Sequence, residues 1–347
     1  MYLLPLIVII FLVLFLPFFV HKVENNLEVF LFFMGLLSIL SSCLFKKIEV
    51  SPHTFIKAAE EPLKITLAVL ISGWLFRRYR EKITSFIVNL EEKIGPHIFA
   101  TLFVFILGLL SSVITAIIAS IVLVEVISAL KLHRDFERKL TVLTCYSIGL
   151  GAALTPVGEP LSTIAVSKLR GEPYHADFFF LLRHLGIYII PGIFAISLYA
   201  GLIHASAGRI LTLKEKSEEA LKDILIRAVK VYVFVMGLVF LSEGFKPVVD
   251  EYISKVSAPV LYWVNLISAI LDNATLTAAE ISPLMEITQI KALLMGLLIS
   301  GGLLIPGNIP NIISAGKLGI KSKEWARDAF LPGVILLLLY FAILFFV

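Results

Sequence analysis

The chain has 347 residues, of which 59% are hydrophobic and only 16% are charged, whereas soluble domains carry about a quarter charged residues. This composition argues against a water-soluble enzyme, and also against a disordered chain, which needs low hydrophobicity. The net charge is +4, but the basic residues lie in short clusters between apolar runs, as in membrane proteins rather than nucleic-acid-binding proteins. The sequence therefore predicts an all-α polytopic membrane protein whose surroundings are the lipid bilayer, with no nucleic-acid partner.

Six apolar segments read as simple membrane spans, because about 20 apolar residues in a helix cover the roughly 30 Å of hydrocarbon. In chain order these segments are residues 3–20, 27–45, 63–76, 178–203, 228–241 and 330–347. The first lacks the basic start and the small-residue cleavage site of a signal peptide. We therefore interpret it as a true span.

Four further apolar stretches are interrupted. Residues 97–130 are too long for one helix and contain Thr115, and the stretch 259–285 contains Asp272. The stretches 140–169 and 290–318 contain prolines and glycines at 155–160 and 306–311. Proline breaks the helical hydrogen-bond ladder, and irregular backbone at membrane depth is tolerated only when it is buried in protein or lines a cavity. We expect two re-entrant helical hairpins, at 97–130 and 256–287, and two broken spans.

These interruptions recur in the same order in two halves of the chain. Residues 109–115 align with residues 266–272, and Gly158-Glu159 align with Gly307-Asn308. Paired, Gly/Pro-interrupted segments are the best sequence indication of a transporter's binding site. The predicted organisation is N-terminal scaffold helices (1–62), a first inverted repeat (63–203), a cytoplasmic linker (204–227) and a second inverted repeat (228–347).

The distribution of lysine and arginine predicts the orientation. If each hairpin returns to the side it entered from, about eight full spans remain, two of them broken, and the repeats are inverted. With the N-terminus outside, twenty of the 30 basic residues then face the cytoplasm and ten face the outside. Such an excess is the rule for cytoplasmic loops, so we expect a multi-pass protein of the plasma membrane. In a ten-span alternative the hairpins cross fully, which makes the halves parallel and blurs the bias.

Asp272 is the strongest candidate for function, because a carboxylate near the bilayer centre costs at least about 2.5 kcal/mol. Together with Asn273 and Thr275 it provides a carboxylate, an amide and a hydroxyl within four residues. Oxygen ligands of this kind suit a hard cation such as Na⁺. The alternative is a neutral aspartic acid that caps a hairpin helix.

Glu159 is the counterpart of Asp272 in the first half. Two carboxylates that share a site away from water cannot both ionise cheaply, so a proton and a metal cation can compete for Asp272 and Glu159. The alternative is that Glu159 pairs with Lys168 or Arg170. Other candidate ligands near the interruptions are Thr155, Ser162, Thr163, Asn308, Asn311 and, more weakly, Thr115.

Two alternatives stay open for the remaining polar residues. Asn308 and Asn311 either complete a coordination shell or only satisfy backbone groups of the break. Glu125 and Glu280, on the returning hairpin arms, either relay protons or line a polar vestibule.

Three segments carry a resemblance to known proteins: residues 266–280 (LISAILDNATLTAAE), 154–168 (LTPVGEPLSTIAVSK) and 301–317 (GGLLIPGNIPNIISAGK). They resemble the ion transporter superfamily, which includes the NhaD-type Na⁺/H⁺ antiporters, arsenite permeases and divalent-anion/Na⁺ symporters. The chain is most similar to that superfamily's uncharacterised prokaryotic family of predicted cation transporters, over residues 60–347. The resemblance implies inverted repeats, re-entrant hairpins and a homodimer.

The NhaD-like pattern matches Asp272-Asn273 and the break from Thr155 to Glu159, which implies that these residues bind cation and proton. The first hairpin departs from it, because Thr115-Ala116 replaces the Asn-Thr or Asp-Asn signature. This departure argues against a second, symmetric cation site and against the symporter function. The resemblance and the residues together predict a secondary active transporter, not an enzyme, that exchanges Na⁺ for H⁺ by alternating access without a cofactor. The alternative is transport of arsenite or a carboxylate anion, bound at helix N-termini.

Overall fold

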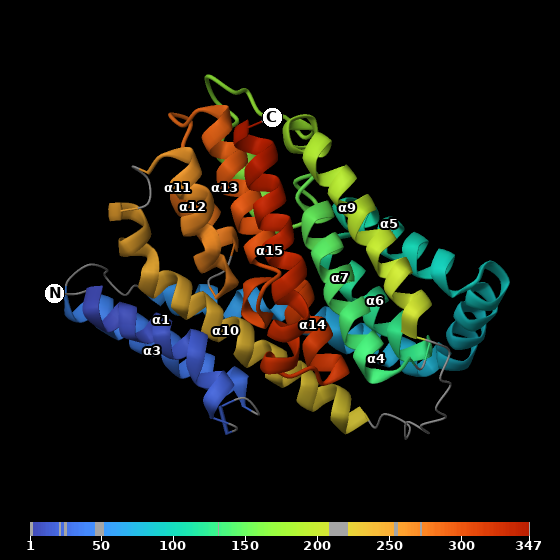
Figure 1. Cartoon of the computed structure of the whole chain (residues 1–347). Helices are drawn as coiled ribbons and strands as arrows, with labels where there is room; N and C mark the ends of the chain where they lie inside the picture. Colours follow the sequence, from blue (N-terminus) through green and yellow to red (C-terminus); the bar gives the residue numbers. More distant parts are fainter. Residues whose placement is uncertain are drawn as a thin grey trace.

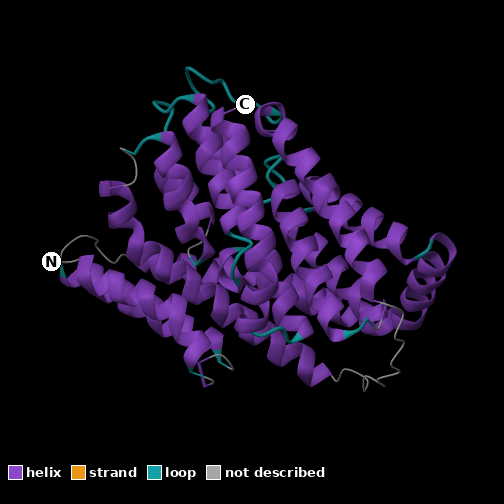
Figure 2. Ribbon diagram, in the orientation of Figure 1, coloured by secondary structure: helices purple, strands orange, loops and turns teal. Residues whose placement is uncertain are grey.

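The computed structural model describes residues 3–20, 22–23, 26–45, 52–130, 132–207, 221–252, 256–270 and 273–346. These residues form helices, turns and short loops, and none of them belongs to a strand (Figure 2). Five of the described helices are long and apolar enough to cross a membrane: Leu27–Leu44, Pro96–Ile114, Phe180–Ile203, Ala228–Phe245 and Ser322–Phe346. The protein is therefore helical, with the helix lengths of a membrane-embedded chain.

The helices follow one another in the order shown in Figure 1. The first half of the described chain contains α1 (Leu3–Phe19), α3 (Leu27–Leu44), α4 (Pro52–Ile94), α5 (Pro96–Ile114), α6 (Ala116–Leu130), α7 (Arg134–Ala152), α8 (Pro160–Lys168) and α9 (Phe180–Ala207). The second half contains α10 (Leu221–Tyr252), α11 (Ala258–Val264), η2 (Asn265–Ala269), α12 (Asn273–Glu280), α13 (Ile287–Ser300), η3 (Ile305–Gly307), α14 (Ile309–Leu318) and α15 (Ser322–Phe346). The two η elements are short 3₁₀-helices.

Four of the six predicted simple spans coincide with helices of membrane-crossing length, namely α3, α9, α10 and α15. The predicted span 3–20 forms α1, whose apolar part is shorter. The predicted span 63–76 lies inside α4, which runs for 43 residues and continues through the polar stretch 77–93. Helix α5 has 19 residues and is itself long enough to cross a bilayer, so the re-entrant hairpin at 97–130 stays a prediction.

The N-terminal helices form a layer beside α10. Figure 1 shows α3 lying next to the long helix α10, and α1 packs against α3. Helix α3 approaches α10 closely because small residues face each other: a Cβ atom on Gly237 would lie 2.6 Å from the backbone nitrogen of Phe32. The hydroxyl of Ser42 donates to the carbonyl oxygen of Gly244 at 2.6 Å. Close backbone approach and interhelical hydrogen bonds of this kind stabilise helix pairs where the hydrophobic effect cannot.

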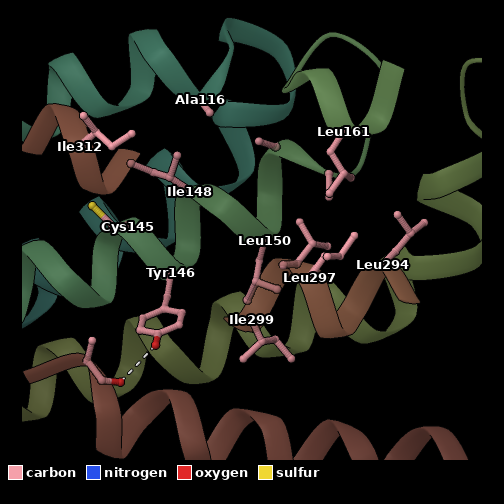
Figure 3. Close-up of a cluster of buried hydrophobic side chains, with 14 of the residues drawn as sticks. Ala116, Cys145, Tyr146, Ile148, Leu150, Leu161, Leu294, Leu297, Ile299 and Ile312 are labelled. Carbon is pink, nitrogen blue, oxygen red and sulfur yellow. Dashed lines mark hydrogen bonds between the residues drawn. The ribbon is translucent and has the colours of Figure 1, made fainter. Parts of the chain in front are cut away.

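Helix α7 occupies the centre of the core. Every residue of α7 from Leu140 to Ala152 is buried. Figure 3 shows Ile148 of α7 directed toward Ile312 of α14, while Leu150 lies among leucine and isoleucine side chains of α13. The hydroxyl of Tyr146 donates to the carbonyl oxygen of Ala329 on α15 at 3.1 Å (Figure 3). Helix α7 therefore connects the first half of the chain to the three last helices of the second half.

Candidate functional site

The first break separates α7 from α8. Helix α7 ends at Ala152, and α8 begins at Pro160 after seven residues without regular structure. Pro160 is at the start of α8, where its missing N–H costs no helical hydrogen bond. Glu159 is the residue before α8, has extended backbone angles (φ −156°, ψ 160°) and is 8% exposed. This carboxylate therefore lies inside the protein, directly before α8, the second half of the broken helix (each such half is called a half-helix below).

The second break separates α13 from α14 and has the same form. Helix α13 ends at Ser300, η3 fills part of the interval, and α14 begins at Ile309 with Pro310 in its first turn. Asn308 precedes α14 with extended angles (φ −151°, ψ 144°) and is 7% exposed. The residues that the sequence alignment paired, Glu159 and Asn308, thus have the same place before a half-helix.

The turn between α5 and α6 contacts the first break. Thr115 separates these helices with a positive φ of 74°. The backbone N–H of Ala116, at the start of α6, donates to the carbonyl oxygen of Gly158 at 2.8 Å. The hydroxyl of Thr155 donates to the carbonyl oxygen of Ser112 at 2.5 Å. The first break is therefore held by the tip of the first predicted hairpin.

The second break is held from two directions. The side-chain amide of Asn311 donates to the carbonyl oxygens of Gly301 and Leu304, at 2.8 and 2.9 Å, and so closes the irregular segment on itself. Gly149 of α7 has no room for a Cβ atom, which would lie 2.7 Å from the Asn308 side-chain nitrogen. The amide nitrogen of Asn273, at the start of α12, would lie 2.8 Å from a Cβ atom on Gly301. The break thus lies between α7 and the start of α12.

Some predicted site residues lie in or directly after the two breaks, some approach a break from another element, and some lie outside the described part of the chain. Thr155 and Glu159 lie in the first break, and Asn308 lies in the second, with Asn311 just after it in α14. Asn273 reaches the second break and Thr115 lies in the turn at the first. Asp272 lies outside the described residues, and so does the side chain of Thr275.

Three predicted hydroxyl ligands are occupied by backbone groups. The hydroxyl of Ser162 donates to the carbonyl oxygen of Ala152 at 3.4 Å, across the break. The Thr163 hydroxyl donates to the carbonyl oxygen of Pro156. The oxygen of Thr155 also accepts from the N–H of Val157 at 3.2 Å. These hydrogen bonds give the side chains a structural role in shaping the first break.

A hydroxyl network beside the second break was not predicted from the sequence. Ser268 of η2 donates to the carbonyl oxygen of Leu297 at 2.9 Å, and Ser300 donates to the carbonyl oxygen of Asn265 at 2.8 Å. These bonds join η2 to α13. The signal available in the sequence was Ser268, four residues before Asp272, because serine often bonds to helix carbonyls.

Several buried polar atoms have no hydrogen-bond partner among the described residues. They include Oδ1 of Asn311, Oδ1 of Asn265, both side-chain polar atoms of Asn273, Oγ1 of Thr277 and both carboxyl oxygens of Glu280. Unpartnered buried polar atoms are uncommon and call for a bound water, ion or proton. The described residues contain no cluster of three histidine, cysteine or acidic side chains that could hold a metal ion.

At two crossings, the half-helix after each break packs against a helix from the other half of the chain. Helix α8 packs against α12, and α14 packs against α6. At the second crossing Lys317 of α14 donates to the carboxylate of Glu125 on α6, and both side chains are mostly buried. At the first crossing the ammonium group of Lys168 donates to the carbonyl oxygen of Ile281, directly after α12, at 3.2 Å. Each break is therefore followed by a half-helix whose terminal lysine reaches the opposite half.

A protein-family model matches residues 3–347, which is nearly the whole chain including both breaks. The chain belongs to the DUF1646 family. The description of that family is protein of unknown function. No curated protein matches the chain. The DUF1646 match shows that the N-terminal helices and both interrupted halves belong to one family unit.

Proposed function

We propose that this DUF1646 protein is a secondary active transporter, a proton-coupled antiporter of a small inorganic cation, with Na⁺ as the cation. The observation that carries the proposal is the pair of buried helix breaks, each ending in an extended residue with a polar side chain, Glu159 or Asn308. Backbone of this kind is stable inside a membrane protein where it lines a binding cavity. In transporters, discontinuous helices of two repeats form the substrate site.

The packing of the helices supports two repeats related by a two-fold axis. Helix α5 packs against α7 as α11 packs against α13, and α7 packs against α9 as α13 packs against α15. Helix α4 contacts α6 as α10 contacts α12, and the crossings of α8 with α12 and of α14 with α6 are reciprocal. This pattern is expected if α4–α9 and α10–α15 are equivalent units related by a two-fold axis. Alternating access then follows from movement of the half-helices and hairpins against the scaffold.

Contacts between charged ends support the eight-span arrangement, which places residues 131–139 and 317–328 on the same side of the membrane, the side with the excess of basic residues. Arg134 donates to the carbonyl oxygens of Leu318 and Gly319, both at 2.8 Å. Arg138 pairs with Asp328 at 2.9 Å. These groups come from distant parts of the chain, and all were assigned to the cytoplasmic side.

The side chains at the breaks suit a cation. Glu159 supplies a carboxylate, and Asn311 has an amide oxygen without a partner among the described residues. Asn273 and Asn308 add amide groups to the same region, and hard cations prefer such oxygen ligands. We place Asp272, the residue before Asn273, as the second carboxylate. Exchange of protons for Na⁺ on Asp272 and Glu159 is the proposed mechanism.

An anion transporter is the second candidate. The N-termini of α8 and α14 both lie at the breaks, and helix N-termini attract anions. Arsenite or a carboxylate could bind there. The carboxylate of Glu159 directly before α8 opposes an anion, which is why we favour a cation.

Ion flux in proteoliposomes tests the proposal. With a pH gradient in place, addition of Na⁺ or Li⁺ should dissipate the gradient, and Asp272→Asn and Glu159→Gln should each abolish this effect. Glu172→Gln is the matched control, because Glu172 is an exposed carboxylate in the loop after α8. If Na⁺ and Li⁺ cause no proton movement and the proteoliposomes take up arsenite or a dicarboxylate, the antiporter is wrong and the anion transporter replaces it.

A further inference from the structure

Helix α12 has a polar face that is fully buried. Asn273, Thr277 and Glu280 are separated by four and three residues, so their side chains lie along one face of the helix. They are 4%, 0% and 2% exposed. This α12 stripe begins at the residue after Asp272 and ends at the other end of the helix.

The stripe is unsatisfied along its whole length. Both polar side-chain atoms of Asn273, the hydroxyl of Thr277 and both carboxyl oxygens of Glu280 have no hydrogen-bond partner among the described residues. The Asn265 side chain faces Glu280, and its Oδ1 atom also lacks a partner among those residues. A continuous row of such groups is stable only if waters, ions or protons bind along it.

Helix α6 differs from α12 at the aligned position. Ser120 of α6, which aligns with Thr277, donates to the carbonyl oxygen of Ala116 at 2.5 Å, whereas the hydroxyl of Thr277 has no hydrogen-bond partner among the described residues. The buried glutamate of α6, Glu125, forms an ion pair with Lys317, whereas both carboxyl oxygens of Glu280 have no hydrogen-bond partner among those residues.

The surroundings of Glu280 contain no ion-pair partner among the described residues. Helices α8, α10 and α13 pack against α12. Their titratable side chains include Lys168, whose ammonium is on the Ile281 carbonyl oxygen, Lys291, which lies 5.4 Å from the centre of the Tyr188 ring, and Glu243, which is half-buried on α10. A buried carboxyl group without a cationic partner is most stable when neutral.

Lys168 is close to a position in which it could pair with Glu280. Its ammonium group binds the carbonyl oxygen of Ile281, the residue next to Glu280. Lys168 lies nine residues after Glu159, and Lys317 lies nine residues after Asn308, so the alignment of the two breaks pairs these lysines. Lys317 does pair with a buried glutamate, Glu125, on the opposite half. A lysine thus lies near a buried glutamate at both crossings. At the crossing of α14 with α6 the lysine pairs with the glutamate, and at the crossing of α8 with α12 its ammonium group binds the carbonyl oxygen of the residue next to the glutamate.

We propose that Glu280 relays the coupled proton between water and the carboxylates Asp272 and Glu159, and that when it releases its proton to water its carboxylate pairs with the ammonium group of Lys168. With Glu280 protonated, the only charge of the pair is that of Lys168, which is exposed at the end of α8, and ionised Glu280 is neutralised by Lys168. Thr277 and Asn273 line the route by which water and the proton reach the second break. This inference rests on the proposed proton-coupled function and adds a proton site separate from Glu159.

The test compares two fluxes in the same proteoliposomes. Glu280→Gln keeps the size of the side chain and imitates its neutral form. It should retain exchange of ²²Na⁺ for Na⁺ at the wild-type rate while Na⁺-driven proton movement falls at least tenfold. Glu280→Asp should restore part of the proton movement. Glu172→Gln, the exposed control carboxylate, should keep both fluxes.

The outcomes separate this inference from the proposed function. If wild-type protein shows no cation-driven proton movement, both are overturned. If wild-type protein shows it and Glu280→Gln keeps it, or loses Na⁺ exchange as well, Glu280 is not the proton site although the antiporter stands. A loss of proton coupling in Glu172→Gln equal to that in Glu280→Gln would also overturn the assignment.

Discussion

Glu159 and Asn308 have nearly the same backbone conformation and the same position, each being the last extended residue before the second half of a broken helix. One carries a carboxylate and the other an amide. The two breaks therefore present polar side chains that differ in charge. In the proposed transporter the two breaks therefore contribute one carboxylate, that of Glu159. Asp272, the residue before α12, contributes the second.

Asn308→Asp should therefore move the pH dependence of transport. A second carboxyl group at the breaks cannot ionise cheaply beside Glu159, so one of the two will hold its proton to higher pH. We expect the pH of half-maximal Na⁺-driven proton flux to rise by about one unit. Asn308→Ser, which adds no charge, is the control. An unchanged profile in Asn308→Asp would mean that the two residues do not share a site.

Removing one partner of the ion pair between Lys317 and Glu125 should destabilise the protein, because the other charge stays buried without it. Its side chains are only 13% and 11% exposed. Lys317→Met leaves a buried carboxylate without its cation and should lower the free energy of unfolding by about 3–5 kcal/mol. Adding Glu125→Leu should recover most of this loss, because an apolar pair can replace a buried ion pair. Unfolding of purified protein in detergent, followed over a denaturant series, measures the effect.

An exposed ion pair provides the comparison. Arg183 and Asp177 pair at 2.7 Å with side chains 55% and 56% exposed. Arg183→Gln should change the free energy of unfolding by less than about 1 kcal/mol. Equal effects of Arg183→Gln and Lys317→Met would contradict the buried position of the Lys317 pair.

The close contact of α5 with α7 predicts a size limit at Gly151. A Cβ atom at this position would overlap the carbonyl oxygen of Gly108, and neither backbone can yield without separating the helices. Gly151→Ala should therefore destabilise the protein by about 1–3 kcal/mol or more. Thermal unfolding in detergent measures the loss.

Gly316 is the matched control for Gly151. It lies on the exposed side of α14, and a Cβ atom added there would have no other atom within 4 Å. Gly316→Ala should leave stability unchanged or raise it by about 0.5–1 kcal/mol, because alanine favours the helix. Destabilisation of equal size in both variants would show that the tight contact between α5 and α7 is not what limits residue 151.

Some of these features could be predicted from the sequence and others could not. The breaks could be located because residues 156–160 and 306–310 each combine two prolines and a glycine, whereas the single prolines Pro191 and Pro332 lie inside α9 and α15. The extent of α4 could not, because the apolar segment covers only residues 63–76, although the lysine, arginine and glutamate residues of 77–93 are good helix formers. The roles of Ser162 and Thr163 also escaped prediction, since their hydroxyls bond to carbonyl oxygens across the break. Those bonds depend on the folded path of the chain rather than on local residue spacing.

The eight-span orientation can be separated from the ten-span alternative at one loop. Residue 171, between α8 and α9, is outside in the eight-span arrangement and cytoplasmic in the ten-span one. Residue 323, in α15, is cytoplasmic in both. Gly171 is exposed, with open space around a Cβ atom, and Lys323 is exposed as well. Both positions can therefore accept a reactive cysteine.

Labelling of intact cells should distinguish these arrangements. In a background in which the two free cysteines, Cys43 and Cys145, are replaced by alanine, Gly171→Cys should react with a membrane-impermeant maleimide from outside. Lys323→Cys should react only after permeabilisation, because its side holds the excess of basic residues. If Gly171→Cys also needs permeabilisation, the first hairpin crosses the membrane fully. The halves would then be parallel, and the two-fold axis inferred from the reciprocal crossings of α8 with α12 and α14 with α6 would lie along the membrane normal instead of in the membrane plane.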